Sequence, residues 1–122
     1  MPNRYERITN VHKLMLIRML KKVARDNNAK IWRYVADLLQ NPRRLKVEVN
    51  LSKINRYTKE GDIVVVPGKV LGSGILEHSI TVAAYSYSES ARRKILDAGG
   101  RVLSIEELVN ENPKGSNVKI II

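Results

Sequence analysis

IVVVPGKVLGSGIL, at residues 63–76, joins an uninterrupted apolar run to a segment that holds three glycines. Residues 63–66 contain no polar side chain, which is typical of a strand buried on both faces of a parallel sheet. We expect Pro67 to end this strand, because proline lacks the N–H that a central strand donates. The glycines favour a turn into a further strand, so the stretch predicts an α/β domain.

The glycine-rich part of this stretch raises the question of a phosphate or cofactor site. It fails the P-loop pattern, because Gly68-Lys69 is followed by Val70 and no glycine stands at the required earlier position. It fails the dinucleotide pattern as well, because Gly72 and Gly74 are followed by strand-like sequence and not by a helix that could hold a phosphate. Two interpretations remain: a plain turn, or a turn that also brings Lys69 and backbone N–H groups to phosphate.

The chain after the glycines alternates short strands with short helices. Strands are expected at about 80–85, at 102–103 and in the closing VKIII. Two capping boxes, Ser86 with Glu89 and Ser104 with Glu107, each predict the start of a helix. The first helix should end at Gly99-Gly100 and the second before Pro113.

The chain before residue 63 is helical first and then extended. Residues 1–9 read as an arm, and helices are expected at about 10–25 and from a cap at Asn28 to about 40. In the second helix Trp32 has core spacing, although it could also stack on a base. A half-buried strand with Leu45, Val47 and Val49 inward should precede a helical turn at 51–57, with Leu51, Ile54 and Tyr57 inward. We therefore expect one domain over 1–122, with a basic arm and helices at about 1–41 and an α/β core at about 42–122.

Charge is distributed unevenly along the chain. The protein has 22 Lys and Arg against 12 Asp and Glu, a net charge of +10. Residues 1–60 hold 15 basic and 5 acidic side chains, whereas residues 61–122 hold 7 of each. This asymmetry points to a polyanionic partner for the first half, since unneutralised like charges repel one another.

Composition excludes several classes of function. The absence of cysteine rules out thiolate zinc sites, disulfides and thiol catalysis. His12 and His78 are far apart, and no carboxylate or histidine spacing suits a metal, so we expect no enzyme activity, no metal, no cofactor and no small-molecule substrate. No apolar run reaches the ~18 residues of a membrane helix, and no signal peptide is expected.

Basic side chains recur at spacings that suit a phosphate backbone. Arg18, Lys21, Lys22 and Arg25 fall at i, i+3, i+4 and i+7 of the first expected helix, although a solvated outer face would show the same pattern. No base-reading motif is present, so we expect contacts with backbone and shape. The candidates from charge and spacing alone are Arg4, Arg7, Lys13, Arg18, Lys21, Lys22, Arg25, Arg43, Arg44, Lys46, Lys53, Arg56 and Lys69.

Three stretches resemble one known family. NPRRLKVEVNLSKINRY at 41–57, VVVPGKVLGSGIL at 64–76 and ITVAAYSYSESARRKILDAGG at 80–100 are similar to the archaeal and eukaryotic large-subunit ribosomal protein family L-eighteen-e, which is related to bacterial large-subunit protein fifteen. NPKGSNVKI at 112–120 fits the archaeal form, and the resemblance covers nearly the whole chain.

The resemblance implies a structural protein of the cytoplasmic large ribosomal subunit, bound to rRNA and to neighbouring ribosomal proteins, with no catalytic activity and no membrane. It implies a compact α/β fold of repeated strand–strand–helix turns. The family positions suited to rRNA are Arg43, Arg44, Asn50, Lys53, Arg56 and Lys69, with either Arg92 or Arg93. Charge alone would also fit a free, chromatin-like DNA-binding protein, and the glycines alone would fit a nucleotide-dependent enzyme.

Overall fold

A computed structural model describes residues 11–40 and 47–122, and within them the chain forms five helices and a five-stranded parallel sheet. The elements and their bounds, in chain order, are α2 (Val11–Asp26), α3 (Lys30–Leu39), β1 (Glu48–Asn50), α4 (Leu51–Tyr57), β2 (Ile63–Leu71), β3 (Thr81–Tyr87), α5 (Glu89–Asp97), β4 (Arg101–Ser104), α6 (Ile105–Glu111) and β5 (Val118–Ile120). The expected α/β class is confirmed.

The sheet is organised around β2, the strand that opens on the apolar run. β2 pairs with β3 on one side, and on the other side with β5 along its first half and β1 along its second. β4 pairs with β3 at the far edge. All these pairs are parallel, so β2 and β3 must be joined by a segment that runs back along the sheet.

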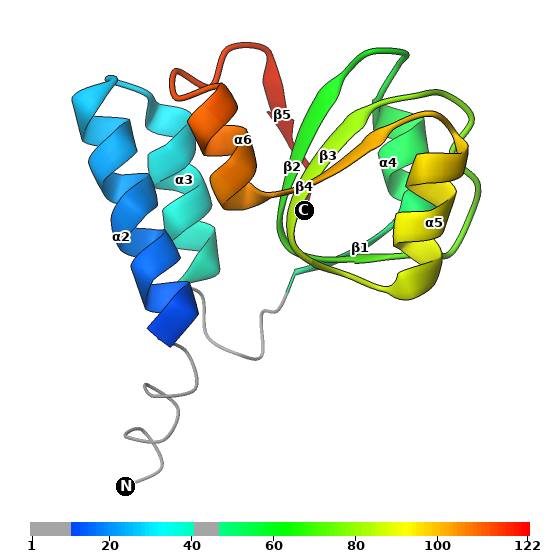
Figure 1. Cartoon of the computed structure of the whole chain (residues 1–122), viewed down its shortest axis with the longest axis horizontal. Helices are drawn as coiled ribbons and strands as arrows, with labels where there is room; N and C mark the ends of the chain where they lie inside the picture. Colours follow the sequence, from blue (N-terminus) through cyan, green and yellow to red (C-terminus); the bar gives the residue numbers. More distant parts are fainter. Residues whose placement is uncertain (1–10, 41–46) are drawn as a thin grey trace, which may run out of the picture.

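Helices cover both faces of this sheet (Figure 1). On one face α2, α3 and α6 pack with Val65 and Ala83 in one apolar cluster. On the other face α4, α5 and the segment after β2 pack with Val64 and Val66 in a second cluster. Successive residues of β2 thus enter opposite clusters, as the continuous apolar run predicts.

Pro67 does not end its strand, contrary to expectation. β2 continues to Leu71, and its register against β3 shifts between Val66 and Lys69. This irregularity accommodates a residue that has no N–H to donate. The first part of the glycine-rich segment is therefore strand, and the connection to β3 begins at Gly72.

Two predicted helix caps are wrong. Asn28 has a φ of 52° and serves the turn between α2 and α3, so the N-cap of α3 is Ala29, in extended conformation. Ser86 lies within β3, and the N-cap of α5 is Ser88, whose Oγ accepts a hydrogen bond from the Ala91 N–H. In both places the neighbouring turn or strand extends further than the spacing indicated.

Most of the other local predictions are confirmed, and the one for Tyr57 is wrong. Ser104 and Glu107 form the expected capping box of α6. Gly99, with φ of 83°, ends α5 in a Schellman motif in which the N–H of Gly100 donates to Ile95. The strand predicted over Leu45–Val49 is observed as the shorter β1 within the described residues. Tyr57 is exposed rather than inward, because α4 is short and its buried side chains are Leu51 and Ile54.

Candidate nucleic-acid interface

The cations predicted on the first helix lie on α2, which packs against α3 and α6. Arg18, Lys22 and Arg25 are exposed and Lys21 is half-buried, while the helix turns Leu16, Ile17 and Leu20 into the core. The exposed cations therefore occupy the surface that the apolar side of the helix leaves open.

Lys13 is partly engaged within the protein. Its Nζ lies 5.7 Å from the centroid of the Tyr85 ring, at the start of α2 where His12 also meets that ring edge-on. A cation held over an aromatic face retains its charge, but its position is set by the ring. Lys13 is thus a weaker candidate for an RNA contact than the cations further along α2.

A second group of predicted residues lies on the opposite face of the sheet. Lys53 and Arg56 are exposed on α4, and Arg92 and Arg93 are exposed on α5. The Nζ of Lys53 donates to the carbonyl of Ile122 at 2.6 Å, so part of its hydrogen-bonding capacity is used internally.

Asn50 and Lys69 lie on the two neighbouring strands β1 and β2. Asn50 is exposed at the end of β1, and its side chain makes no capping hydrogen bond to α4. Lys69 is exposed and lies directly across from Glu48 in the strand register. An opposite charge at the paired position offsets part of the positive potential there.

The structure thus divides the predicted site residues between two faces instead of bringing them together. α2 lies on one face of the sheet, whereas α4 and α5 lie on the other (Figure 1). One continuous rRNA surface cannot be drawn through all of them without passing round the edge of the sheet. The predicted contacts Arg4, Arg7, Arg43, Arg44 and Lys46 lie outside the described residues.

The glycines after β2 serve close packing. A Cβ at Gly74 would stand 2.5 Å from the Ser52 Cβ, and one at Gly72 would collide with Ser90 and stand 2.9 Å from the Ala91 nitrogen. The segment is therefore pressed between α4 and α5, which only residues without a side chain permit.

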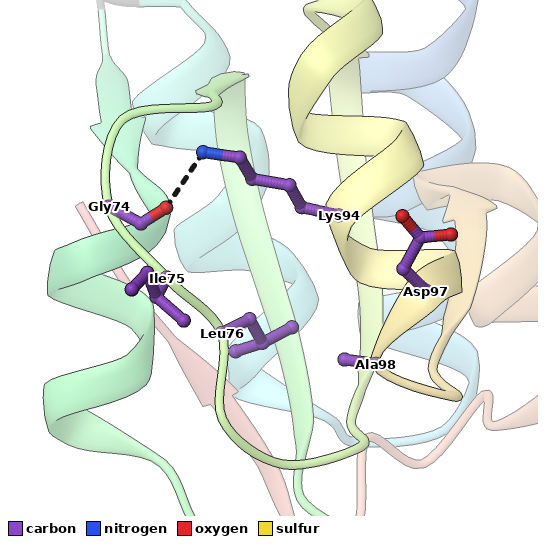
Figure 2. A pocket seen from close by; sticks show the side chains of 6 residues that line it. All are labelled: Gly74, Ile75, Leu76, Lys94, Asp97 and Ala98. Atoms are coloured by element: carbon purple, nitrogen blue, oxygen red, sulfur yellow. Dashed lines mark hydrogen bonds between the residues drawn. The ribbon is translucent and has the colours of Figure 1, made fainter.

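Lys94 of α5 fastens the same segment. Its Nζ donates to the Gly72 carbonyl at 2.7 Å and to the Gly74 carbonyl at 2.9 Å. Figure 2 shows this lysine reaching across a hollow of about 250 Å³ toward the segment, with Ile75, Leu76 and Asp97 around it. Because carbonyl oxygens here face a cation, the geometry favours a structural turn over a phosphate cradle.

Lys30 and Arg33 were not among the predicted site residues. With Lys21 and Arg25 they line a cleft of about 400 Å³ at the turn from α2 to α3, which we call the elbow cleft. Lys30 and Arg33 stand three apart at the start of α3, a spacing visible in the sequence. Their closeness to the α2 cations depends on the tight turn, which the sequence pattern did not specify.

Several carboxylates act as local structural groups. The hydrogen bond from Lys119, together with one from the Lys59 N–H, holds the pKa of Asp62 below its ordinary value. Hydrogen bonds from Ser79 lower the pKa of Glu60, and the capping contacts to Ser104 lower that of Glu107. Glu60 and Glu107 are exposed, the Asp62 side chain is 13% exposed, and all three are engaged in turns and caps, which is not the arrangement of a catalytic acid or base.

The histidines lie in separate local contacts. His78 Nε2 lies 2.7 Å from Thr58 Oγ1, within hydrogen-bond distance, and the Thr58 hydroxyl donates to the Ile54 carbonyl. His12 Nε2 lies 3.5 Å from a carboxylate oxygen of Glu106. Over residues 11–40 and 47–122, no three His, Asp or Glu side chains gather into a group that could hold a metal ion.

Two aromatic side chains have clear structural roles. Trp32 is fully buried and its Nε1 donates to the Pro113 carbonyl at 2.9 Å, which excludes the base-stacking interpretation. Burial raises the pKa of the Tyr87 hydroxyl, which lies within hydrogen-bond distance of the Val82 and Leu103 carbonyls.

In the described part of the chain, no helix has the length and apolar character needed to cross a membrane.

Comparisons with known proteins all point to one family. Residues 2–122 match the family described as "Ribosomal protein 60S L18 and 50S L18e". A "Large ribosomal subunit protein eL18" of Methanoregula boonei is 53% identical over 113 residues, which is 93% of each chain. Proteins of the same name from Pyrobaculum aerophilum, 54% identical over 93% of each chain, and Methanococcus maripaludis, 53% identical over 93% of this chain and 94% of that one, are similarly close. Because the match is nearly full-length and identity exceeds half, the chain belongs to the ribosomal protein family of 60S L18 and 50S L18e.

Proposed function

We propose that this protein binds the rRNA of the large subunit through basic surfaces that contact phosphate and shape rather than base identity. The coarser part of this function follows from the family: the chain is a structural protein of the large ribosomal subunit and a component of the cytoplasmic ribosome. Members of such families are generally not enzymes. The relatives named above are archaeal, which agrees with the archaeal form indicated by the sequence.

The observation that carries the rRNA proposal is the charge of the α2–α3 pair. Residues 11–40 hold seven Lys and Arg against two Asp, and most of these cations are exposed. A helical pair with this excess attracts a phosphate backbone and releases the counterions condensed on it. Neither helix exposes an aromatic pair of the kind that stacks bases in RNA-reading sheets.

The other basic residues are proposed as a second contact region. Lys53 and Arg56 on α4 and Arg92 and Arg93 on α5 are exposed on the far face of the sheet from α2. An rRNA fold that wraps the protein would reach both faces. The further members of the proposed set are Lys13, Arg18, Lys21, Lys22, Arg25, Asn50 and Lys69, together with Arg4, Arg7, Arg43, Arg44 and Lys46 from outside the described residues.

We further propose that neighbouring ribosomal proteins contact the electrically balanced second half. Ile75 is 73% exposed and Leu96 is 50% exposed, in the segment after β2 and in the helix beside it. Large apolar side chains left in water on a basic protein suit a protein neighbour better than a phosphate backbone.

Sedimentation and competition test the proposal. The protein should co-sediment with the large subunit in sucrose gradients at moderate salt, and isolated protein should bind a large-subunit rRNA transcript more tightly than duplex DNA of equal length. If 6–10 phosphates are contacted, affinity should fall by about 10³–10⁵ between ~50 and ~200 mM salt. Recovery only in the free fraction would contradict the proposal, and preference for DNA would favour the chromatin-like alternative, which the family match does not support.

A further inference from the structure

We propose that the elbow cleft is a phosphate-binding site that holds adjacent backbone phosphates of one rRNA strand. The cleft has a volume of about 400 Å³ and is lined by Lys21 and Arg25 of α2, Lys30 and Arg33 of α3, and Asn28 with two alanines between them. This inference rests on the proposed rRNA-binding function and assigns it to a defined place. It also separates two members of the predicted α2 stripe, Lys21 and Arg25, from Arg18 and Lys22, which do not line the cleft.

The fold builds the cleft from a tight reversal of the chain. The Ala29 N–H donates to the Ala24 carbonyl at 2.9 Å and the Asn27 side chain donates to the Val23 carbonyl at 3.0 Å, which closes the end of α2. Asn28 supplies the left-handed residue that such a turn requires. Ala24 and Ala29 leave the space between the helices hollow, so long basic side chains from both helices surround it.

The charges around the cleft are only partly balanced. Arg25 lies 3.9 Å from Asp26 and Arg33 lies 3.9 Å from Asp37, measured from Nε to a carboxylate oxygen. These distances are long, and both carboxylates are more than half exposed, so each pair is weak. Within residues 11–40 and 47–122 neither Lys21 nor Lys30 takes part in an ion pair, and the cleft therefore keeps a net positive charge.

The lining favours a phosphate backbone over other anionic occupants. None of the lining residues is aromatic or a large aliphatic, so the cleft offers no ring or apolar wall that would enclose a nucleoside base. A docking site for an acidic protein segment would need an apolar centre, which the two alanines do not supply. Lysine and arginine around a hollow floored by small residues provide what phosphate oxygens require: several N–H donors and positive charge.

Matched double variants test the site. Lys21→Gln with Lys30→Gln removes two cations from the cleft, and Lys59→Gln with Lys114→Gln removes two exposed cations elsewhere that are not proposed RNA contacts. Binding to a large-subunit rRNA transcript is measured across ~50–200 mM salt. The cleft variant should bind about tenfold more weakly, and the slope of log affinity against log salt should become shallower by about 1 for each lysine removed. The control variant should change both quantities much less.

The outcomes separate failure of the site from failure of the proposed function. If wild-type protein binds rRNA and the cleft variant behaves as the control does, the site is overturned and the rRNA function stands. If wild-type protein does not bind rRNA, both are overturned. Unchanged thermal unfolding of the cleft variant, expected because neither lysine belongs to the core, shows that a loss of affinity is not a loss of fold.

A chemical footprint identifies the occupant in the assembled subunit. Lys21 and Lys30 should resist acetylation in intact large subunits and become reactive after nuclease digestion of the rRNA. Reactivity in the intact subunit would overturn the proposal. Protection that survives complete nuclease treatment would also overturn it, because it would show a protein neighbour in the cleft.

Discussion

Within residues 11–40 and 47–122, two of the hollows are bordered by basic side chains, whose roles in the two places are opposite. In the segment after β2, Lys94 donates to two backbone carbonyls of its own chain, and the glycines there allow the segment to pack against two helices. In the elbow cleft four cations face one another with two long contacts to aspartate. In the first hollow the cation is hydrogen-bonded within the protein. In the second, most of the positive charge is available to a partner.

The availability of a cation is decided by the groups around it, not by its position in a basic or neutral half of the chain. The glycine-rich segment has the sequence more suggestive of a phosphate site. The lysine beside it, Lys94, nevertheless has a structural role, because it donates hydrogen bonds to the carbonyls of that segment. The elbow has no recognisable motif, yet its two helices bring four cations to one hollow.

The largest expected effect comes from filling the close contact at Gly74. Gly74→Ala should destabilise the fold by about 3 kcal/mol or more, because it combines positive-φ strain of about 1–3 kcal/mol with a clash of similar cost. Denaturant unfolding measures the loss. The folded fraction should bind rRNA with the salt dependence of the wild type, since the elbow is untouched.

Gly61→Ala is the matched control for that change. Gly61 also has a positive φ, of 85°, but a Cβ there would meet nothing within 4 Å. We expect this variant to lose only about 1–2 kcal/mol, which reports backbone strain alone. Equal losses in the two variants would mean that close packing against Ser52 is not what requires Gly74.

A smaller effect on stability is expected when Lys94 is replaced. Lys94→Met should lower the unfolding free energy by about 1 kcal/mol, since it removes two hydrogen bonds at an exposed site, and should leave the salt dependence of rRNA binding unchanged. Lys30→Met should do the reverse, with stability within about 0.5 kcal/mol of wild type and a salt slope shallower by about 1. If both variants reduced the slope equally, the contrast between the two hollows would be wrong.

Much of the fold could be predicted because its signals are local. The apolar run 63–66, the capping box of Ser104 and Glu107 and the paired glycines at 99–100 each act within a few residues, and each is confirmed. The errors at Pro67 and Ser86 arose where strand pairing with a distant partner extended the strand beyond its local pattern. Pairing of this kind is a tertiary effect, which local propensity does not report.

The candidate site was less predictable than the fold. Charge placement and spacing identified Lys21 and Arg25, but the helical stripe alone did not distinguish them from Arg18 and Lys22. Lys30 and Arg33 were not predicted, because their closeness to α2 depends on the turn at Asn28. The sequence pattern had indicated a helix cap at that residue instead of a turn. Likewise, nothing in the order of residues showed that the sheet would separate α2 from α4 and α5.

The smallest expected effect is a loss of stability at acid pH. Asp62, Glu60 and Glu107 have pKa values held below their ordinary values of 3.8, 4.5 and 4.5, mainly by hydrogen bonds. A carboxyl whose pKa is lower in the folded state adds stability above its unfolded pKa and loses that contribution as pH falls through the folded pKa. Unfolding free energy should therefore decline as pH is lowered below about 4.5, while the cations of the elbow cleft stay charged.

Glu107→Gln isolates one of these groups. Glutamine can still accept the hydrogen bond from the Ser104 N–H, but it has no charge to lose, so the variant should be less stable than wild type near neutral pH and equally stable at the acid end. Denaturant unfolding at pH 7, 4 and 3 follows this convergence. A constant difference across the series would show that the carboxylate charge of Glu107 does not stabilise the start of α6.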